Sequence, residues 1–245
     1  MKQPREFETP PGPVIVRNVT REDIPQIIDL HRRCFPQMME SDEAWREDQL
    51  LSHLEVFAEG QLAAEFEGKV VGVAASLIVD MGNDPLRHHT YYGVTDDGYF
   101  YNHDARGDTL YGADVFVDPE SRGQGIGGIL YEVRRDMCRR LNLRRILGGG
   151  RLWKYADYAD ELTPEEYVLR VQAGEIDDLV LSFQLREGFA VRGIMQNYIR
   201  DPRSLNHASL IEWLNPDYQV DTEEERKVRV ACVQYKMRRI SGFDE

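Results

Sequence analysis

The sequence predicts a mixed α/β domain, and three observations carry this prediction. Apolar, β-branched segments alternate with capped, helix-like segments along most of the chain. The chain has 245 residues, of which 42% are apolar and 30% charged, which is ordinary for a soluble globular domain. It shows neither an internal repeat nor a low-complexity segment. The expected element order is β-α-α-β-β-β-α-β-α-α-β-β, followed by a linker and a strand.

The first half of the chain is predicted to place two helices between strands. The expected elements are a strand at 14–20, a helix ending at 34, a helix at about 42–57, two strands within 61–79 and a strand at 109–117. Thr20 and Asp23 form a capping box for the first helix, and Pro36 ends it. Ser41 caps the second helix, and the turn at 67–69 joins two strands of a hairpin.

The second half continues the pattern. The expected elements are a helix at 126–141, a short strand at 144–150, a helix at 163–174, a helix at 178–188 and strands at 189–199 and 207–214. Thr163 and Glu166 form a capping box with a proline between them at the first helical position. Gly174 and Gly188 end the two later helices.

Charge and cysteine content exclude several classes of function. The net charge of −13 argues against nucleic-acid binding, which requires a basic face. Cys34, Cys138 and Cys232 lie far apart, which argues against a disulfide framework and favours a reducing compartment. The longest apolar run, 70–79, is half of the ~20 residues that a membrane helix needs. The first 14 residues contain no apolar signal region, so a cytoplasmic protein without a membrane partner is expected.

The glycine-rich stretch 122–128, RGQGIGG, lies between a strand and a helix. It contains the spacing G-x-G-x-x-G, but a dinucleotide site needs an acidic residue about 20 positions later, and Gly148 stands there. No G-K-[ST] follows, so a P-loop is excluded as well. The ordinary alternative is a turn that merely starts a helix. A helix N-terminus also attracts phosphate groups through its unpaired N–H groups and its dipole, and the flanking glycines and Arg122 favour such binding here.

Basic residues continue beyond this loop. They are Arg134, Arg135, Arg139, Arg140, Arg144, Arg145, Arg151 and Lys154. Such a locally basic face on an acidic protein indicates a small polyanionic ligand, and a solvated helix face is the ordinary alternative for each residue.

At this point the sequence resembles motif A of the GNAT superfamily, the acetyl-CoA-dependent N-acetyltransferases. The motif [Q/R]-x-x-G-x-[G/A] is met by Arg122, Gly125 and Gly127. The strand before the motif ends in VFVDP, as the family's strand does. The resemblance extends over the element order from 14 to 213. It implies the GNAT acyl-CoA N-acyltransferase fold, in which the two central strands splay apart.

The resemblance implies that acetyl-CoA is the cofactor. Its pantetheine arm would lie between the splayed strands, its pyrophosphate on the glycine loop, and the triple glycine 148–150 would leave room there. Backbone groups of the preceding strand would hold the arm and polarise the thioester carbonyl. The implied cofactor-binding residues are Val115, Phe116, Val117, Arg122, Gly123, Gln124, Gly125, Ile126, Gly127 and Gly128.

The implied reaction is direct transfer of an acetyl group to an amine of a small molecule or a peptide. The amine must lose a proton, and the leaving thiolate must gain one. Asp114 is the candidate base, with Tyr111 on the same strand as a second candidate. An aspartate that merely accepts hydrogen bonds from a neighbouring loop is the ordinary alternative.

The family's acid is where this sequence departs from the pattern. Relatives often carry N-x-x-A-x-x-x-Y-x-x-x-G-F, and here Gln184 replaces the tyrosine and Asp177 the asparagine. A glutamine side chain cannot act as a proton donor of this kind. Ser182, Tyr198 or water would then serve, or the thiolate would leave unaided, or the domain would bind CoA without catalysis.

Two segments, 81–108 and 153–178, are longer than the minimal fold needs. Their aromatic residues are Tyr91, Tyr92, Tyr99, Phe100, Tyr101, Tyr155, Tyr158 and Tyr167. These aromatic residues are expected either to line an acceptor pocket or an interface, such as that of a homodimer, or only to pack locally. His88, His89 and His103 invite comparison with a metal site, but adjacent histidines rarely chelate one ion, so no metal is expected.

The end of the chain has a second resemblance. The stretch VRVACVQY at 228–235 resembles the opening strand of the nitrilase (carbon–nitrogen hydrolase) superfamily. The implied organisation is a GNAT-like domain at 1–214, an acidic linker at 215–227 and the start of a fused hydrolase domain at 228–245. The domain would then serve as an acetyltransferase or as a CoA-binding regulatory or scaffold module of the hydrolase. A last strand that completes the sheet is the ordinary alternative.

Overall fold

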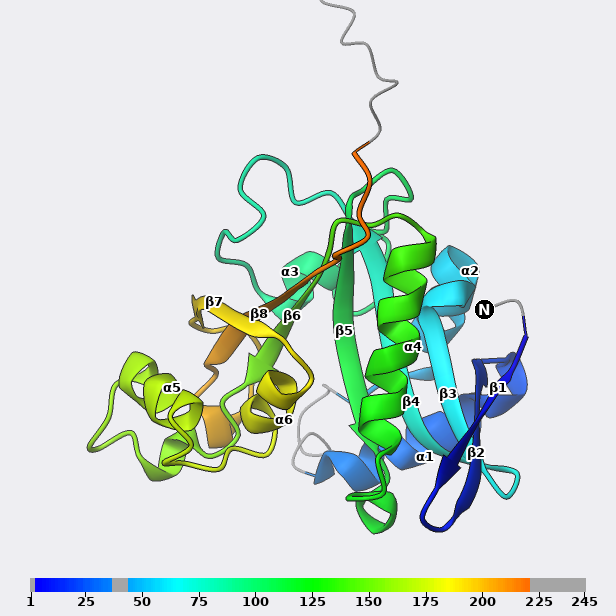
Figure 1. Cartoon of the computed structure of the whole chain (residues 1–245), viewed down its shortest axis with the longest axis horizontal. Helices are drawn as coiled ribbons and strands as arrows, with labels where there is room; N and C mark the ends of the chain where they lie inside the picture. The colour runs from blue at the N-terminus through cyan, green and yellow to red at the C-terminus, as the bar shows by residue number, and fades with distance from the viewer. Residues whose placement is uncertain (1–2, 37–43, 221–245) are drawn as a thin grey trace, which may run out of the picture.

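An eight-stranded mixed sheet runs through the computed structural model, which describes residues 3–36 and 44–220 (Figure 1). The strand order is β1-β2-β3-β4-β5-β6-β8-β7, and only β5 and β6 pair in parallel. The strands are β1 (Arg5–Thr9), β2 (Gly12–Asn18), β3 (Gln61–Phe66), β4 (Lys69–Val79), β5 (Thr109–Val117), β6 (Arg145–Arg151), β7 (Ala190–Met195) and β8 (Ala208–Leu214). The predicted mixed α/β fold is confirmed.

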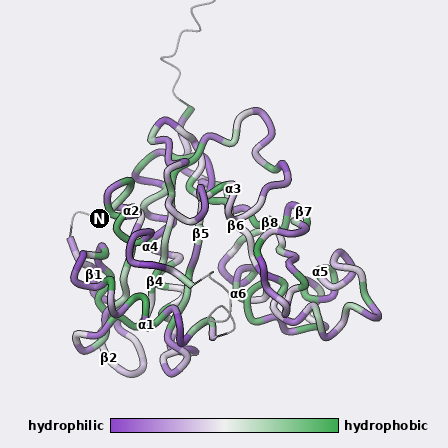
Figure 2. The backbone as a smooth tube through the Cα atoms, turned by 180° about the vertical axis from the view of Figure 1, so that it is seen from behind, coloured by the Kyte–Doolittle hydropathy of each residue, from purple (hydrophilic) through white to green (hydrophobic). Residues whose placement is uncertain are grey.

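Helices cover both faces of this sheet. They are α1 (Ile24–Cys34), α2 (Glu47–Phe57), α3 (Tyr91–Thr95), α4 (Ile126–Arg140), α5 (Pro164–Gln172) and α6 (Leu181–Arg186). In Figure 1, α4 crosses in front of β4 and β5, whereas α1 lies behind them. Figure 2 shows from behind that β7, β8, α5 and α6 form one side of the molecule and β1–β4 the other, with hydrophobic segments in both. None of the helices in the described ranges is long and apolar enough to cross a membrane.

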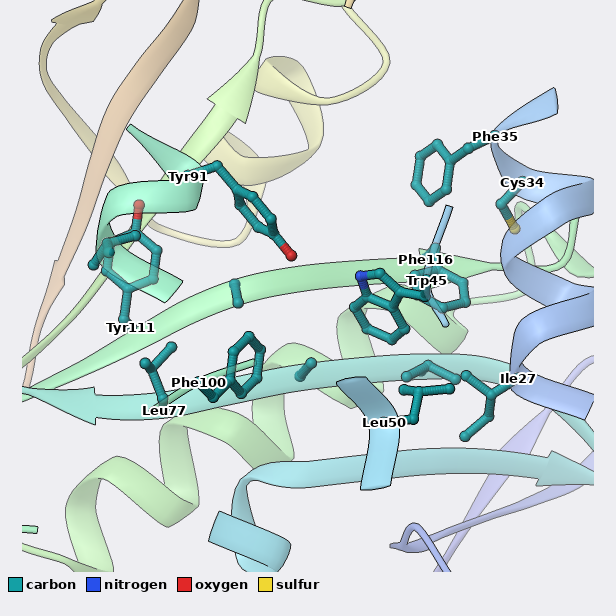
Figure 3. Packing of buried hydrophobic residues seen from close by; sticks show 14 of the residues in the cluster. Ile27, Cys34, Phe35, Trp45, Leu50, Leu77, Tyr91, Phe100, Tyr111 and Phe116 are labelled. Carbon is teal, nitrogen blue, oxygen red and sulfur yellow. The ribbon is translucent and has the colours of Figure 1, made fainter. Parts of the chain in front are cut away.

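Apolar clusters lie on both faces of the sheet, one on one face and two on the other. The residues that α1, α2 and α3 bury against β4 and β5 form one apolar cluster, part of which is shown in Figure 3. The faces of α4, α5 and α6 bury other clusters on the opposite side. Because β4 is covered on both faces, every residue of it after Lys69 is buried. The continuous apolar run at 70–79 is therefore a central strand.

The two central strands separate partway along their length. Pairing between β5 and β6 covers Thr109 to Tyr111 opposite Arg145 to Leu147 and then stops. From there β5 continues to Val117 along β4, and β6 continues to Arg151 along β8. The sheet therefore splits in its middle, which confirms the splayed strands.

A β-bulge in β5 lies where this split begins. The register with β4 passes from Asp114 opposite Ala75 to Gly112 opposite Ser76, so Ala113 is the extra residue. The buried Arg134 of α4 reaches the bulge and donates to the carbonyl oxygens of Ala75 at 2.9 Å and Asp114 at 2.7 Å. Gly112 makes room for it, because a Cβ there would lie 2.8 Å from the guanidinium.

Most arginines of the expected basic face are buried or paired with carboxylates. Arg134 is buried under the bulge, and Arg145 forms a buried ion pair with Glu212 at 2.8 Å. Other ion pairs join Arg135 to Glu187, Arg139 to Asp136 and Asp217, and Arg140 to Glu59. Charge counting along the chain could not show this, because the acidic partners come mostly from distant segments.

Several element boundaries differ from those expected. The second helix begins at Glu47 rather than 42, with Arg46 at its N-cap, and Ser41 lies outside the described residues. The strand expected over 189–199 ends at Met195. β1 was not expected at all, and the short helix α3 lies within the segment predicted as irregular. The capping box of Thr163 and Glu166 is confirmed by hydrogen bonds of 2.9 and 3.2 Å.

The beginning of the predicted linker is bound to the domain. Asn215 is buried and donates from Nδ2 to the carbonyl oxygen of Leu143 at 2.8 Å. The side chain of Asn142 forms two hydrogen bonds with the backbone of Gln219, at 2.8 and 2.9 Å. The expected strand at 228–235 lies outside the described residues.

Candidate functional site

A cavity of about 690 Å³ opens where β5 and β6 part. Its walls come from β5, from β6 and from the loop before α4, with further residues from α6 and from the segment after β7. On the α1 side, Phe35 and Tyr91 line it as well, and Figure 3 shows them near β5 with Trp45 and Phe116. A volume of this size is typical of a small-molecule site.

The glycine loop forms one rim of the cavity. Gly123 and Gly125 have φ angles of 76° and 86°, and a Cβ on either would meet nothing within 4 Å. Gly125 is the N-cap of α4, so the unpaired N–H groups of the first helical turn lie behind an open surface. Arg122 is exposed beside them and donates from Nε to the carbonyl oxygen of Val117 at 3.3 Å. This arrangement suits a phosphate group.

The residues predicted to bind a cofactor largely come together at this cavity. Those that line it are Val115, Phe116, Val117, Arg122, Gly123, Gly125, Ile126, Gly127 and Gly128. Gln124 does not line it. Asp114 and Tyr198, two of the proposed catalytic residues, also line the cavity, whereas Tyr111 and Ser182 do not.

Two of the three glycines of β6 make room for side chains rather than only for a ligand. A Cβ on Gly149 would lie 2.1 Å from Cζ of Tyr198. A Cβ on Gly150 would lie 2.1 Å from Oε1 of Gln184, which comes from the other face of the strand. Tyr198 and Gln184 therefore pack directly on the backbone of β6 at the cavity wall.

Tyr198 begins a short chain of hydrogen bonds. Its hydroxyl lies 2.8 Å from that of Tyr111, which in turn lies 2.8 Å from Nε2 of His89. Nδ1 of His89 lies 2.9 Å from the carbonyl oxygen of Arg87, so this nitrogen carries the proton and donates it. Burial lowers the pKa of His89, which keeps the ring neutral and leaves Nε2 to accept from Tyr111. Tyr111 can then accept from Tyr198.

Burial raises the pKa of Tyr198 well above its usual range, so the phenol holds its proton at neutral pH. The pKa of Asp114 is also raised by burial, although the positive charge of Arg151 opposes this effect. The cavity thus contains a protonated phenol and a carboxylate whose proton affinity is increased. The phenol thus has a proton to donate, although burial makes it a weaker acid, and burial makes the carboxylate a stronger base.

Two other candidates are placed differently. The hydroxyl of Ser182 accepts from the backbone N–H of Asp178 at 3.0 Å, outside the cavity. Gln184 lines the cavity, is 6% exposed and leaves Oε1 without a hydrogen-bond partner among the described residues. It stands where the family pattern has a tyrosine, and it offers the cavity an amide.

The three histidines weighed for a metal site lie in separate environments. Nε2 of His88 bonds to the carbonyl oxygen of Gln196 at 2.7 Å, and Nδ1 of His103 accepts from Ile78 at 3.0 Å. Within residues 3–36 and 44–220, no group of three or more histidine, cysteine, aspartate and glutamate side chains could hold a metal ion. His89 is instead the member of the hydrogen-bond chain that sequence reasoning missed, because its partner Tyr111 is distant in sequence.

Comparison with known proteins agrees with this geometry. A family model described as "Acetyltransferase (GNAT) family" matches residues 24–151. "Probable hydrolase YhcX" of Bacillus subtilis is 44% identical over 238 residues, which are 95% of this chain but 45% of that protein. "Uncharacterized N-acetyltransferase YkwB" of the same organism is 39% identical over 215 residues, covering 88% of this chain and 93% of the relative.

Among solved structures, the "GphF GNAT-like decarboxylase in complex with isobutyryl-CoA" is similar with a TM-score of 0.71. It is 23% identical and covers 82% of this chain and 98% of its own, so the likeness concerns the fold. The family model spans α1, α4, the split strands β5 and β6 and the glycine loop, whereas α6 and the segment after β7 follow it in the chain. The chain therefore belongs to the GNAT family of acetyltransferases.

Proposed function

We propose that this chain is a CoA-dependent N-acyltransferase domain that transfers an acetyl group from acetyl-CoA to an amine by direct attack. The observation that carries the proposal is the cavity between β5 and β6, which leads to the glycine loop at the N-terminus of α4. A residue with a side chain at Gly123 or Gly125 would occupy the surface that a diphosphate needs.

The cavity fits such a cofactor. Arg122 and the first N–H groups of α4 would hold the pyrophosphate, and the edge of β5 from Val115 to Val117, which has no partner in β6, would bind the arm. Acetyl-CoA, when bound, supplies an activated thioester. The structures of the similar GNAT-like decarboxylase with isobutyryl-CoA and of this chain share the fold that forms this split.

Two residues of this chain would move the protons. Asp114 would accept the proton of the attacking amine, because burial raises the pKa of its carboxyl group and makes it a stronger base. Tyr198 would turn its O–H from Tyr111 toward the departing thiolate and protonate it. Tyr111, which lies between Tyr198 and His89, could then donate its own O–H to the phenolate that remains. Gln184, which cannot serve as an acid, would only orient groups in the cavity.

Calorimetric titration with acetyl-CoA tests the cofactor site. Gly125→Val should weaken binding about tenfold or more, because its side chain would cover the phosphate surface. Gly68→Val is the matched control: Gly68 also has a positive φ, of 76°, and open space around it, but it lies in the turn between β3 and β4. Equal affinities of both variants for acetyl-CoA would contradict the phosphate site.

Two observations favour a second function. The relative that matches this chain over 45% of its own length is named a hydrolase, and the family's acid tyrosine is replaced by Gln184. The domain would then be a catalytically weak CoA-binding regulatory or scaffold module of a fused carbon–nitrogen hydrolase. Turnover of acetyl-CoA with a panel of amines, followed by free-thiol release, separates the two functions. Binding without thiol release would support the module, and no binding at millimolar ligand would exclude both.

A further inference from the structure

Arg151 is the last residue of β6 and lines the cavity. Its guanidinium carbon lies 4.4 Å from the centre of the Phe35 ring, so one face of the cation rests on an aromatic surface. Nη1 is buried and has no hydrogen-bond partner among the described residues. A buried N–H of a cation that stays unsatisfied destabilises the protein unless a ligand supplies the acceptor.

The charge of Arg151 is not neutralised by an ion pair. Within the described part of the chain, no carboxylate lies within 4 Å of its guanidinium, whereas the neighbouring Arg203 is paired with Asp201 at 3.2 Å. Arg203 in turn stacks on Trp153 at 3.5 Å. The positive charge of Arg151 acts on its surroundings: after burial, it is the second cause that lowers the pKa of His31 to about 3.

The position of Arg151 relates this charge to the reacting groups. Alternate residues of a strand share a face, so Arg151 projects on the same side of β6 as Gly149, on which Tyr198 packs. This is the side of α1, because Phe35 follows that helix. α4 lies on the other side of the sheet, but the loop before it also meets the end of α1, where Arg122 and Cys34 both donate to the carbonyl oxygen of Val117. The N–H groups expected to hold the phosphates belong to the start of α4, and Arg151 is a second cationic group of the same cavity.

We propose that Arg151 binds a carboxylate of one of the two reactants. This inference rests on the acyltransferase function proposed above and names its substrate class. A planar guanidinium matches a carboxylate through two parallel N–H···O bonds, and such a pair gains strength at a partly desolvated site. The surrounding Phe35, Tyr91 and Trp153 would bind the apolar part of the same molecule.

The carboxylate can come from either reactant. In the first case the acceptor is an amino acid, whose amine attacks the thioester while its carboxylate is held by Arg151. In the second case the acyl group carries the carboxylate, as it does when a dicarboxylic acid forms a thioester with CoA through one of its two carboxyl groups. Arg151 would bind the carboxylate in the same way in both cases. Varying the acceptor and the acyl donor one at a time shows which of them carries the carboxylate.

The experiment compares kcat/KM for matched pairs of reactants. With acetyl-CoA as donor, L-amino acids are compared with their carboxamides. With a neutral amine as acceptor, succinyl-CoA is compared with butyryl-CoA. We expect the wild type to prefer the carboxylate member of one pair about ten- to hundredfold, and Arg151→Gln to abolish that preference. Arg151→Lys should restore only part of it, because an ammonium cannot form the paired bonds.

Arg200→Gln is the control, since Arg200 is exposed and follows Tyr198 by two residues without lining the cavity. It should keep the wild-type preference. The preference of each variant is compared with that of the wild type at one pH, so the different basicity of an amino acid and its carboxamide cancels in the comparison. If acetyl-CoA binds and neutral amines are acylated, but neither pair shows a preference that depends on Arg151, this inference is overturned while the proposed function stands. Failure of acetyl-CoA to bind would overturn both.

Discussion

At the scale of single residues, the cavity brings together Asp114 and Tyr198, and burial raises the pKa values of both side chains. Tyr198 is 2% exposed, packs on a glycine and is hydrogen-bonded to a second buried tyrosine. Sequence reasoning named Asp114 from the family pattern and Tyr198 as one substitute for the missing tyrosine, and both line the cavity. It could not rank Ser182 below Tyr198, because the bond between Ser182 and Asp178 depends on how α6 begins.

Arg151 and His89 show why the remainder of the site was missed. In the sequence, Arg151 is one of several arginines near the glycine loop, and His89 is one of two adjacent histidines. Nothing local distinguishes a buried, unpaired guanidinium from an exposed one. Only the pairing of β6 with β8 directs Arg151 toward Phe35, and only the fold brings His89 to Tyr111.

The role of Tyr198 gives a prediction at this scale. Tyr198→Phe keeps the ring on Gly149 but removes the proton donor, so kcat should fall about 10²- to 10⁴-fold while acetyl-CoA affinity stays unchanged. Free-thiol release and calorimetry measure the two quantities. Tyr101→Phe is the control, because Tyr101 is 60% exposed and away from the cavity. An unchanged kcat in Tyr198→Phe would show that water or another group protonates the thiolate.

At the scale of elements, the split between β5 and β6 was predictable from the sequence, and β1 was not. The resemblance to the GNAT family implied the split, and that resemblance rests on a strand, a glycine loop and a helix whose local signals agree. β1 is a short edge strand whose residues alternate between half-buried and exposed, so its sequence carries only a weak strand signal. The register of the bulge at Ala113 depends on Arg134 from another element, which no local pattern reveals.

The glycines of β6 give a prediction for this element. In Gly149→Ala, the new Cβ would lie 2.1 Å from Tyr198, so the ring must move away from the strand. We expect the free energy of unfolding to fall by about 1–3 kcal/mol. We also expect kcat to fall, because the phenol of Tyr198 is displaced from its position in the cavity. Denaturant unfolding and turnover measure both effects.

Gly193→Ala in β7 is the matched control for that substitution, since a Cβ at Gly193 would meet nothing within 4 Å. It should change stability by less than about 0.5 kcal/mol and leave turnover as in the wild type. If Gly149→Ala were equally neutral, the close packing of Tyr198 on β6 would not be needed for either stability or activity.

At the scale of the whole molecule, the sequence predicts a domain end at residue 214, and the structure shows contacts beyond it. Buried Asn215 closes the turn between α4 and β6 through Leu143, and Gln219 is held by Asn142. The composition of 215–227 is polar and acidic, which is typical of a linker. Composition does not distinguish a polar residue in solvent from one that satisfies a buried carbonyl group, because both are hydrophilic.

These contacts predict that two truncations will behave differently. A chain ending at residue 220 keeps every described contact, so its melting temperature and acetyl-CoA affinity should equal those of the full chain. A chain ending at Leu214 leaves the carbonyl groups of Leu143 and Arg144 without the partners that Asn215 provides at 2.8 and 3.0 Å. Each lost buried bond costs about 1–3 kcal/mol, so its melting temperature should fall by about 2–4 °C for each kcal/mol lost. Calorimetric scans of the three chains at equal concentration measure this difference.

Equal melting temperatures of the two truncated chains would place the domain end at 214. A loss of stability in the chain ending at 220 would mean that residues after it stabilise the fold.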